Sequence, residues 1–256
     1  MELVDTHCHL DIEAFDDDRE QVLRRTRASG VTRMVVPGVN AGRWSGLLQL
    51  CAREAGVYPA LGLHPVYLGQ HRLQDVERLA ALIEQHGPVA VGEIGLDYFV
   101  PDLDRGQQQA LFEAQLIVAR DAGLPVILHV RKAHDQVLAT LRRIQVKGGT
   151  AHAFNGSMQQ ARQYQDLGFM LGFGGMLTYA RSRRIRALAA QLPLDAMVLE
   201  TDAPDMAVAA HHGQRNSPEY LPDCLQALAD IRAEDPEQVA RQTTANACSV
   251  LGLGCV

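Results

Sequence analysis

The sequence has few cysteines, and they do not form the pairs that disulfide frameworks or thiolate zinc sites require. The five are an odd number, widely scattered and without a C-x-x-C pair: Cys8, Cys51, Cys224, Cys248 and Cys255. Neither a disulfide framework nor a cysteine zinc site is therefore favoured. We expect small buried apolar residues, with Cys255 near the terminus as an exposed thiol.

Long apolar runs and an excess of basic residues are also missing. No run approaches the roughly 20 apolar residues that span a bilayer. Residues 1–5 lack the basic and apolar regions of a signal peptide. We therefore predict a soluble, cytoplasmic protein with no membrane partner and no obligate protein partner. The net charge of -6 has the wrong sign for bulk attraction to nucleic acid, so any such contact must be local.

Short apolar runs instead alternate with longer amphipathic segments along the chain. Eight runs rich in Val, Ile, Leu and Gly predict strands at Leu3–His9, Arg33–Val39, Val57–Leu63, Val89–Gly95, Pro125–Val130, Gly149–Phe154, Phe169–Gly174 and Met197–Asp202. The segments between them predict helices. In one of them Val76, Leu79, Ala80 and Ile83 repeat at i, i+3, i+4 and i+7, which places them on one helical face.

This alternation predicts an α/β fold with a parallel sheet covered by helices. Eight units in about 200 residues fit a closed TIM (β/α)₈ barrel. Two extra C-terminal helices are expected at about Pro218–Arg232 and Pro236–Leu251. No linker or shift of composition marks a boundary, so we expect a single domain over residues 1–256. A doubly wound open sheet has the same periodicity and is the alternative.

Several predicted strands end in a side chain that can bind a metal, at the edge where barrel enzymes assemble their sites. The first strand ends in His7-Cys8-His9, and residues i and i+2 of a strand project to one side, so both histidines can grip one ion while Cys8 points away. The fourth ends near Glu93, which lies in an apolar run between two glycines. The fifth, sixth and eighth end in His129, His152 and Asp202.

A single histidine at a strand end is usually a solvated rim residue, and an H-x-H pair alone is a weak signal. Burying four imidazoles and two carboxylates together, however, would be costly without a cation. Six donors also exceed the four of a structural zinc site. The predicted partition assigns His7, His9 and Asp202 to one ion, His129 and His152 to a second, and Glu93 to a bridge between them. Two such ions bind a shared hydroxide as nucleophile, and Asp202 can accept the proton of that water.

Several stretches of the chain are motifs that one known family shares. They are Val4-Asp5-Thr6-His7-Cys8-His9, Gly62-Leu63-His64-Pro65, Val91-Gly92-Glu93-Ile94-Gly95-Leu96-Asp97, His129-Val130-Arg131 and Glu200-Thr201-Asp202-Ala203-Pro204. Together they resemble the TatD family of metal-dependent deoxyribonucleases. The match covers essentially the whole chain in order and spacing. The resemblance implies a TIM barrel of the amidohydrolase superfamily, two divalent metals and hydrolysis of DNA phosphodiester bonds, and it assigns metal binding to the same six residues.

Further candidates surround this set. His64 resembles a family site residue that contacts a phosphate or protonates a leaving oxygen; a rim histidine ordered by the following proline is the alternative. Arg131 should share a face with His129, as a phosphate clamp or as part of a salt bridge. Tyr98 is placed to stack on a base or sugar, or at the edge of the core. Glu200 shares the face of Asp202 and can orient a ligand or serve as a structural carboxylate.

The leading hypothesis is therefore a deoxyribonuclease, with catalytic roles for Asp202, Glu93 and His64. Two alternatives stay open. One is a dinuclear hydrolase of esters, lactones, amides or phosphotriesters, although Glu93 stands where some relatives carry a carbamylated lysine. The other is a non-catalytic binding module that a metal stabilises. Four imidazoles suit Zn²⁺ or Mn²⁺ better than Mg²⁺, whereas the resemblance suggests Mg²⁺ or Mn²⁺.

Overall fold

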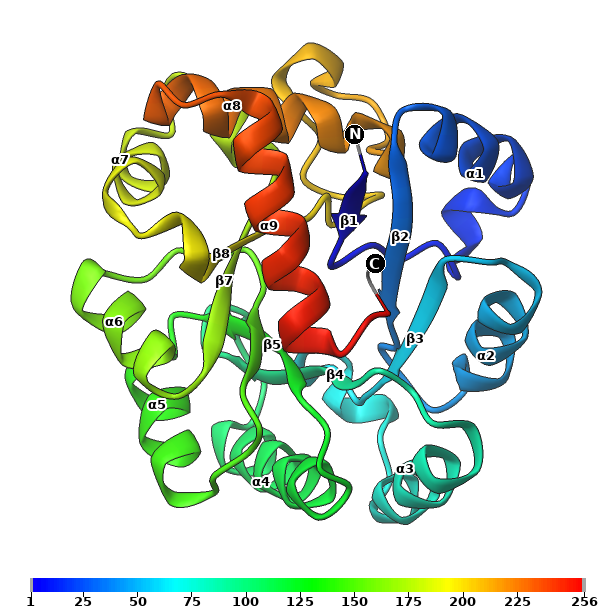
Figure 1. Ribbon diagram of the computed structural model, residues 1–256. Coiled ribbons are helices and arrows are strands. Elements are labelled where there is room, and N and C mark those ends of the chain that lie inside the picture. The colour runs from blue at the N-terminus through cyan, green and yellow to red at the C-terminus, as the bar shows by residue number, and fades with distance from the viewer. Residues whose placement is uncertain (1, 255–256) are drawn as a thin grey trace.

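The chain folds into a barrel of eight parallel strands surrounded by helices (Figure 1). The computed structural model describes residues 2–254, without the side chain of Leu73. The strands are β1 Leu3–Asp5, β2 Val31–Pro37, β3 Val57–Leu61, β4 Ala90–Asp97, β5 Val126–Arg131, β6 Gly149–Ala151, β7 Phe169–Phe173 and β8 Met197–Leu199. They are hydrogen-bonded in sequence order. The Thr6 amide donates to the Leu199 carbonyl (3.1 Å), which brings β8 against β1. This order confirms the TIM barrel and excludes the doubly wound sheet.

Helices follow the strands and cover the outside of the barrel. The longer ones are α1 Arg19–Ala28, α2 Trp44–Arg53, α3 Leu73–His86, α4 Arg105–Asp121, α5 His134–Arg143, α6 Met158–Asp166, α7 Arg183–Gln191, α8 Leu221–Arg232 and α9 Pro236–Leu251. Short 3₁₀ turns include η1 Glu13–Phe15, η2 Pro65–Gln70, η3 Gly175–Thr178, η4 Leu194–Ala196, η5 Ala209–His211 and η6 Pro218–Tyr220. The two extra C-terminal helices are therefore confirmed.

The last helix, α9, crosses the end of the barrel at which the strands begin (Figure 1). The inward-facing residues of the strands include small ones such as Ala60 and Ala90, and they form one apolar cluster with Ala247, Leu251 and Leu253. A larger cluster lies between the strands and the outer helices. Because α9 fills one end, the barrel is open for a binding site only at the opposite end, where the strands terminate.

Five strands are shorter than predicted, β1, β6 and β8 by three residues or more, and the difference has a local cause at β1. The strand ends at Asp5 rather than His9. The Asp5 carboxylate accepts the His7 amide (3.1 Å), the Thr201 amide (3.0 Å) and the Thr201 hydroxyl (2.6 Å). It thereby occupies backbone donors that would otherwise extend the sheet. Strands β6 and β8 likewise end before His152 and Asp202.

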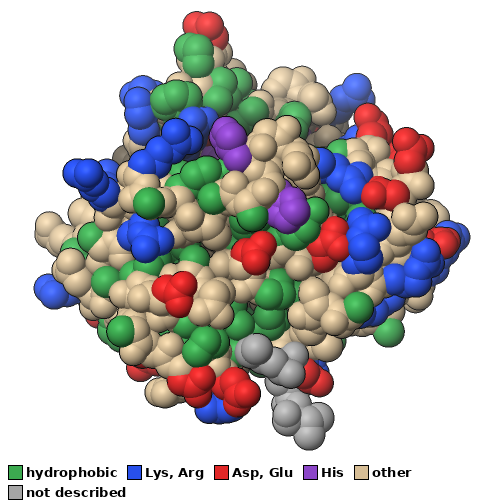
Figure 2. Space-filling view, turned by 90° about the horizontal axis from the view of Figure 1, so that it is seen from above, with side chains coloured by type: hydrophobic (Ala, Val, Ile, Leu, Met, Phe, Trp, Pro, Cys, Tyr) green, Lys and Arg blue, Asp and Glu red, His purple; other side chains and the backbone are tan. Residues whose placement is uncertain are grey.

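Three further expectations concern the cysteines, the membrane and the surface charge. Cys8, Cys224 and Cys248 are buried, Cys51 is partly buried, and the prediction for Cys255 lies outside the described residues. Within residues 2–254 no helix is long and apolar enough to cross a bilayer. Acidic and basic side chains are interspersed on the face that Figure 2 draws.

Candidate metal centre

The six predicted ligands converge at the end of the barrel where the strands terminate. His7 and His9 follow β1, Glu93 lies on β4, and His129 lies on β5; His152 follows β6 and Asp202 follows β8. Their side chains are between 0 and 17 % exposed. Five different strands thus place four imidazoles and two carboxylates in one largely buried cluster.

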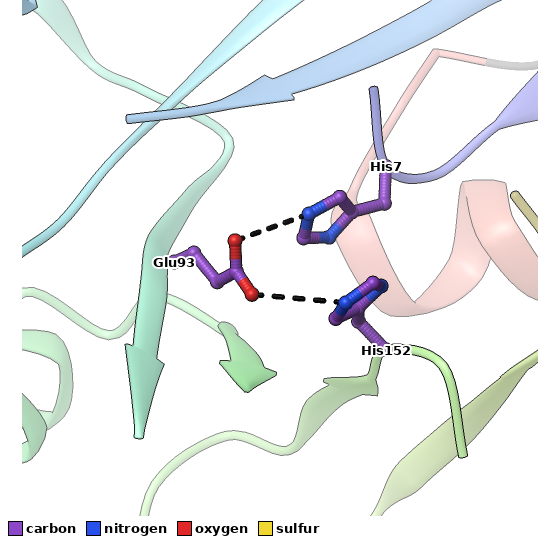
Figure 3. A group of neighbouring side chains, drawn as sticks. All are labelled: His7, Glu93 and His152. Atoms are coloured by element: carbon purple, nitrogen blue, oxygen red, sulfur yellow. Dashed lines mark ion pairs between the residues drawn. The ribbon is translucent and has the colours of Figure 1, made fainter. Parts of the chain in front are cut away.

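Glu93 occupies the middle of this cluster, and its two oxygens face different groups of histidines. Oε2 lies 3.2 Å from His7 Nε2 and 3.6 Å from His9 Nε2. Oε1 lies 3.1 Å from His129 Nδ1 and 3.8 Å from His152 Nε2. Figure 3 shows the carboxylate between His7 and His152, with one oxygen directed at each. This is the arrangement that a bridging carboxylate requires.

His7, His9 and Asp202 form the first of these groups. The two Nε2 atoms are 3.2 Å apart, and Asp202 Oδ1 lies 3.7 Å from His7 Nε2 and 3.6 Å from His9 Nε2. Ligand atoms about 2.1 Å from a tetrahedral ion lie about 3.4 Å from one another. The observed spacings fit a shared divalent cation, and the donor set is one that such cations bind.

The backbone at Asp202 is adapted to this position. Its φ angle is 56°, in the left-handed region that residues other than glycine seldom adopt. Its amide donates to the His7 carbonyl (2.8 Å), which ties the loop after β8 to the loop after β1. Such a conformation costs of order 1–3 kcal/mol and persists where the surroundings enforce it. Here it turns the carboxylate back toward His7 and His9.

Three of the histidines are held by a hydrogen bond from the ring nitrogen that faces away from the cluster. His9 Nδ1 pairs with the Pro37 carbonyl (3.2 Å), His129 Nε2 with Asp97 Oδ2 (2.9 Å), and His152 Nδ1 with Glu200 Oε1 (3.2 Å). A neutral ring that donates from this nitrogen keeps the lone pair of the other nitrogen toward the cluster. These rings are therefore oriented for metal binding before any cation arrives.

Comparison with known proteins agrees with this geometry. The sequence model of a family described as TatD related DNase matches residues 4–252. The chain belongs to the TatD DNase family. It is 40% identical to the metal-dependent hydrolase YjjV of Escherichia coli K12, over 93% of each chain. It is 31% identical to the 3'-5' ssDNA/RNA exonuclease TatD of Klebsiella pneumoniae, over 98% of each. The crystal structure of YjjV from E. coli K12 superimposes with a TM-score of 0.95 at 38% identity, over 98% of both chains.

As a member of the TatD family, the chain is a metal-dependent hydrolase, and without a cation its cluster holds protons instead. Burial alone would lower the pKa of His9, but the Asp202 hydrogen bond and the charges of Glu93 and Asp202 raise it to about 9. Burial also opposes protonation of His152, yet the charges of Glu200 and Asp202 raise its pKa to about 10. The pKa of Glu93 is lowered despite burial, because the imidazoles around it favour its ionised form.

Cation binding to this TatD-family site should therefore release protons, at least about two per chain at pH 7. His9 and His152 have raised pKa values, so both carry a proton at neutral pH that a cation must displace. Affinity should rise as the pH increases from 7 and level off once both pKa values are passed. Calorimetric titration in buffers of different ionisation enthalpy counts the protons. His86→Gln, at the exposed end of α3, should not change the count; binding without proton release would contradict these assignments.

His64 lies beside the cluster, with Nε2 3.3 Å from Glu93 Oε1. The Val66 amide donates to His64 Nδ1 (3.2 Å), so a neutral ring carries its proton on Nε2. Burial lowers the His64 pKa to about 4, which keeps the ring neutral at physiological pH. In this TatD-family chain His64 therefore presents an N–H donor to Glu93, although its ring also lies close enough to Glu93 and His129 to hold a cation with them.

A cavity of about 550 Å³ extends from the cluster toward the loops after β1, β2 and β3. Its lining includes Asn40, Arg43 and Tyr67, which sequence reasoning missed because isolated residues of these common types carry no local signal. The predicted substrate residues Arg131 and Tyr98 are not part of this lining. Tyr98 is partly buried against the core, and Arg131 is exposed.

Sequence reasoning also gave Asp97 no role, although it lies on β4 four residues after Glu93 and so on the same side of an extended strand. Its Oδ2 orients His129 and its Oδ1 accepts the Phe99 and Val100 amides, at 2.8 and 3.0 Å. Burial would raise the Asp97 pKa, but these hydrogen bonds, that from His129 first, lower it to about 2. The spacing from Glu93 was the signal that could have identified it.

Proposed function

We propose that this chain hydrolyses phosphodiester bonds in DNA, acting on single strands from their ends. The observation that carries the proposal is the position of Glu93 between two groups of histidines in a cavity that Tyr67 also lines. The name of the K. pneumoniae relative, an exonuclease of single-stranded DNA and RNA, supports the same bond and strand form. Four imidazoles at the C-terminal end of a barrel also fit metal-assisted hydrolysis.

The site suits divalent cations, Zn²⁺, Mn²⁺ or Mg²⁺: the ligand atoms of His7, His9 and Asp202 lie within 4.8 Å of one another, and those of His129 and His152 lie 3.1 and 3.8 Å from Glu93 Oε1. His7, His9 and Asp202 would hold one, His129 and His152 the other, and Glu93 would contact both. When bound, such cations supply Lewis-acid polarisation of the phosphate and lower the pKa of water. Asp202 is the proposed proton acceptor, because its lowered pKa keeps it ionised and it is the more exposed of the two carboxylates.

His64 contributes a neutral hydrogen-bond donor in this scheme. Its Nε2–H points into the cavity beside Glu93 and would donate to a non-bridging or leaving oxygen of the phosphate. A preorganised donor stabilises the negative charge that develops on oxygen as the transition state forms. The tautomer does not depend on substrate, because the Val66 amide sets it.

Tyr67 provides the aromatic surface that a nucleotide would contact. Its ring is 39% exposed, lines the cavity and lies 5.7 Å from the His64 ring. Stacking of a base on an aromatic ring contributes about 1–3 kcal/mol. Tyr67→Ala should therefore raise KM for short single-stranded DNA by about 5- to 150-fold, whereas Tyr67→Phe, which keeps the ring, should not. Steady-state kinetics of the two variants provide the check; an unchanged KM for Tyr67→Ala would exclude base stacking there.

The proposed function is tested with single- and double-stranded DNA, with chelator and with each cation restored in turn. We expect cleavage of single strands from an end, loss of cleavage with chelator and recovery with metal. Retained DNA binding without cleavage under every condition would indicate a metal-stabilised binding module. Hydrolysis of lactones or phosphotriesters, without hydrolysis of DNA, would show that the chain catalyses a different hydrolysis on the same fold.

A further inference from the structure

The loops after β4 and β5 carry an exposed aromatic ring with two cations beside it. Phe99 is 47% exposed, the largest exposed fraction among the large hydrophobic residues that the structure describes. The Arg131 guanidinium lies 3.6 Å from its ring centroid, and Lys132 Nζ lies 4.6 Å from it. Phe99 follows Asp97 by two residues and Arg131 follows His129 by two, so the group adjoins the metal cluster.

Among the described residues, these two cations have no carboxylate partner. Within residues 2–254, neither Arg131 nor Lys132 lies within 4.0 Å of an acidic oxygen, which differs from the paired Arg43 and Arg215. Two adjacent cations repel each other, and the negative face of an aromatic ring offsets part of that repulsion. In a chain of net charge -6, two unpaired cations gathered on one exposed ring form a local site for an anion.

The position of this group is fixed by the metal cluster itself. The Phe99 amide donates to Asp97 Oδ1 (2.8 Å), while Asp97 Oδ2 holds His129 Nε2 (2.9 Å). The Tyr98 amide donates to the Arg131 carbonyl (2.8 Å), which joins the two loops. The cavity extends from the cluster in a different direction, toward the loops after β1 to β3. A strand that reaches from the cavity to Phe99 would pass His129, which lines the cavity and lies two residues before Arg131.

We propose that Phe99, Arg131 and Lys132 form a phosphate clamp for the nucleotide next to the cleaved bond. The proposal rests on the proposed function and adds the subsite that makes a strand a better substrate than a dinucleotide. Arg131 supplies a planar fork for phosphate oxygens and Lys132 a second charge. The Phe99 ring keeps the two cations side by side through a cation–π contact with each. The clamp would bind the phosphate next to the cleaved one in a single strand. A dinucleotide has only the phosphate that is cleaved, so it cannot occupy the clamp.

The test compares a longer single-stranded oligonucleotide with a dinucleotide. The double variant Arg131→Ala/Lys132→Ala should raise KM for the oligonucleotide about tenfold and leave dinucleotide hydrolysis unchanged. The dependence of log KM on log salt concentration should weaken by about 0.7 for each phosphate that the variant no longer neutralises. Phe99→Ala should produce part of this effect and Phe99→Tyr none. Lys147→Ala, an exposed cation in the loop before β6 and so at the other end of the barrel, is the matched control.

Two outcomes would overturn the clamp. If the double variant and the unaltered chain share the same oligonucleotide KM and salt dependence, the strand does not contact these cations, although the proposed function stands. If neither substrate is cleaved by any variant, the proposed function fails, and the clamp is judged by binding alone. Fluorescence anisotropy with a labelled single strand then decides, and equal affinity for the double variant and the unaltered chain would reject the clamp.

Discussion

Replacing Glu93 with glutamine should lower kcat/KM for DNA hydrolysis by at least about 10³-fold, with loss of bound cation. The carboxylate is 2% exposed and lies within 3.8 Å of five imidazoles, those of His7, His9, His64, His129 and His152. Glutamine has the same shape but lacks the negative charge that offsets the charge of protonated rings or of cations. It also turns an NH₂ group toward the histidines that face either Oε1 or Oε2. Both groups of ligands are affected, because each faces one of the two oxygens.

Metal analysis after dialysis, together with kcat/KM at saturating metal, measures the effect of Glu93→Gln. Glu237→Gln on α9, whose side chain is 71% exposed and far in sequence from the site, should keep both values. Thermal unfolding should show that the variant folds. A variant that retained its full metal content and activity would show that Glu93 does not bridge the two groups.

Asp202→Asn should lower kcat by about 10²- to 10⁴-fold even at saturating metal, the usual contribution of a positioned acid or base. Asparagine tolerates the left-handed backbone of this residue, so the loop after β8 should keep its shape. Its side-chain oxygen can still act as a weak ligand beside His7 and His9, but it accepts no proton at neutral pH. The variant therefore separates holding a cation from accepting a proton.

The measurement for Asp202→Asn is a titration of activity against metal concentration. A weaker apparent metal affinity, together with a low kcat at saturating metal, supports both roles of Asp202, as metal ligand and as proton acceptor. Recovery of full kcat at high metal would leave Asp202 as a ligand only and would refute its assignment as the proton acceptor. Asp205→Asn, the exposed carboxylate in the same loop, is the matched control and should keep kcat within about an order of magnitude.

The barrel could be predicted because its signals are local. A strand buried on both faces reads as an apolar run, and helical periodicity lies within each segment, so all eight strands were placed to within a few residues. The six ligands were found because polar side chains at the ends of apolar runs are conspicuous. Their exact backbone was not predictable. The strand expected through His9 stops at Asp5, whose carboxylate accepts an amide from the loop after β8, nearly 200 residues away in sequence.

The surroundings of the site depend on contacts between distant loops, which one sequence does not display. The role of Asp97 follows from the register of β4 against β5, which pairs it with Arg131 and brings it to His129. In the loop after β4, Phe99 is exposed, whereas Tyr98, which the sequence suggested as the stacking residue, packs against the core. Arg43 and Tyr67 line the cavity only because the loops after β2 and β3 lie side by side above the cluster.

The position of α9 has a consequence for how the protein is made. During synthesis all eight strands leave the ribosome before the helix that covers their starting ends. Until Leu251 and Leu253 arrive, the small side chains inside the barrel, such as Ala60 and Ala90, face water through an uncovered end. Exposed apolar surface of this kind promotes aggregation of incomplete chains. A chain cut short before α9 would therefore keep this apolar end exposed and would be prone to aggregate.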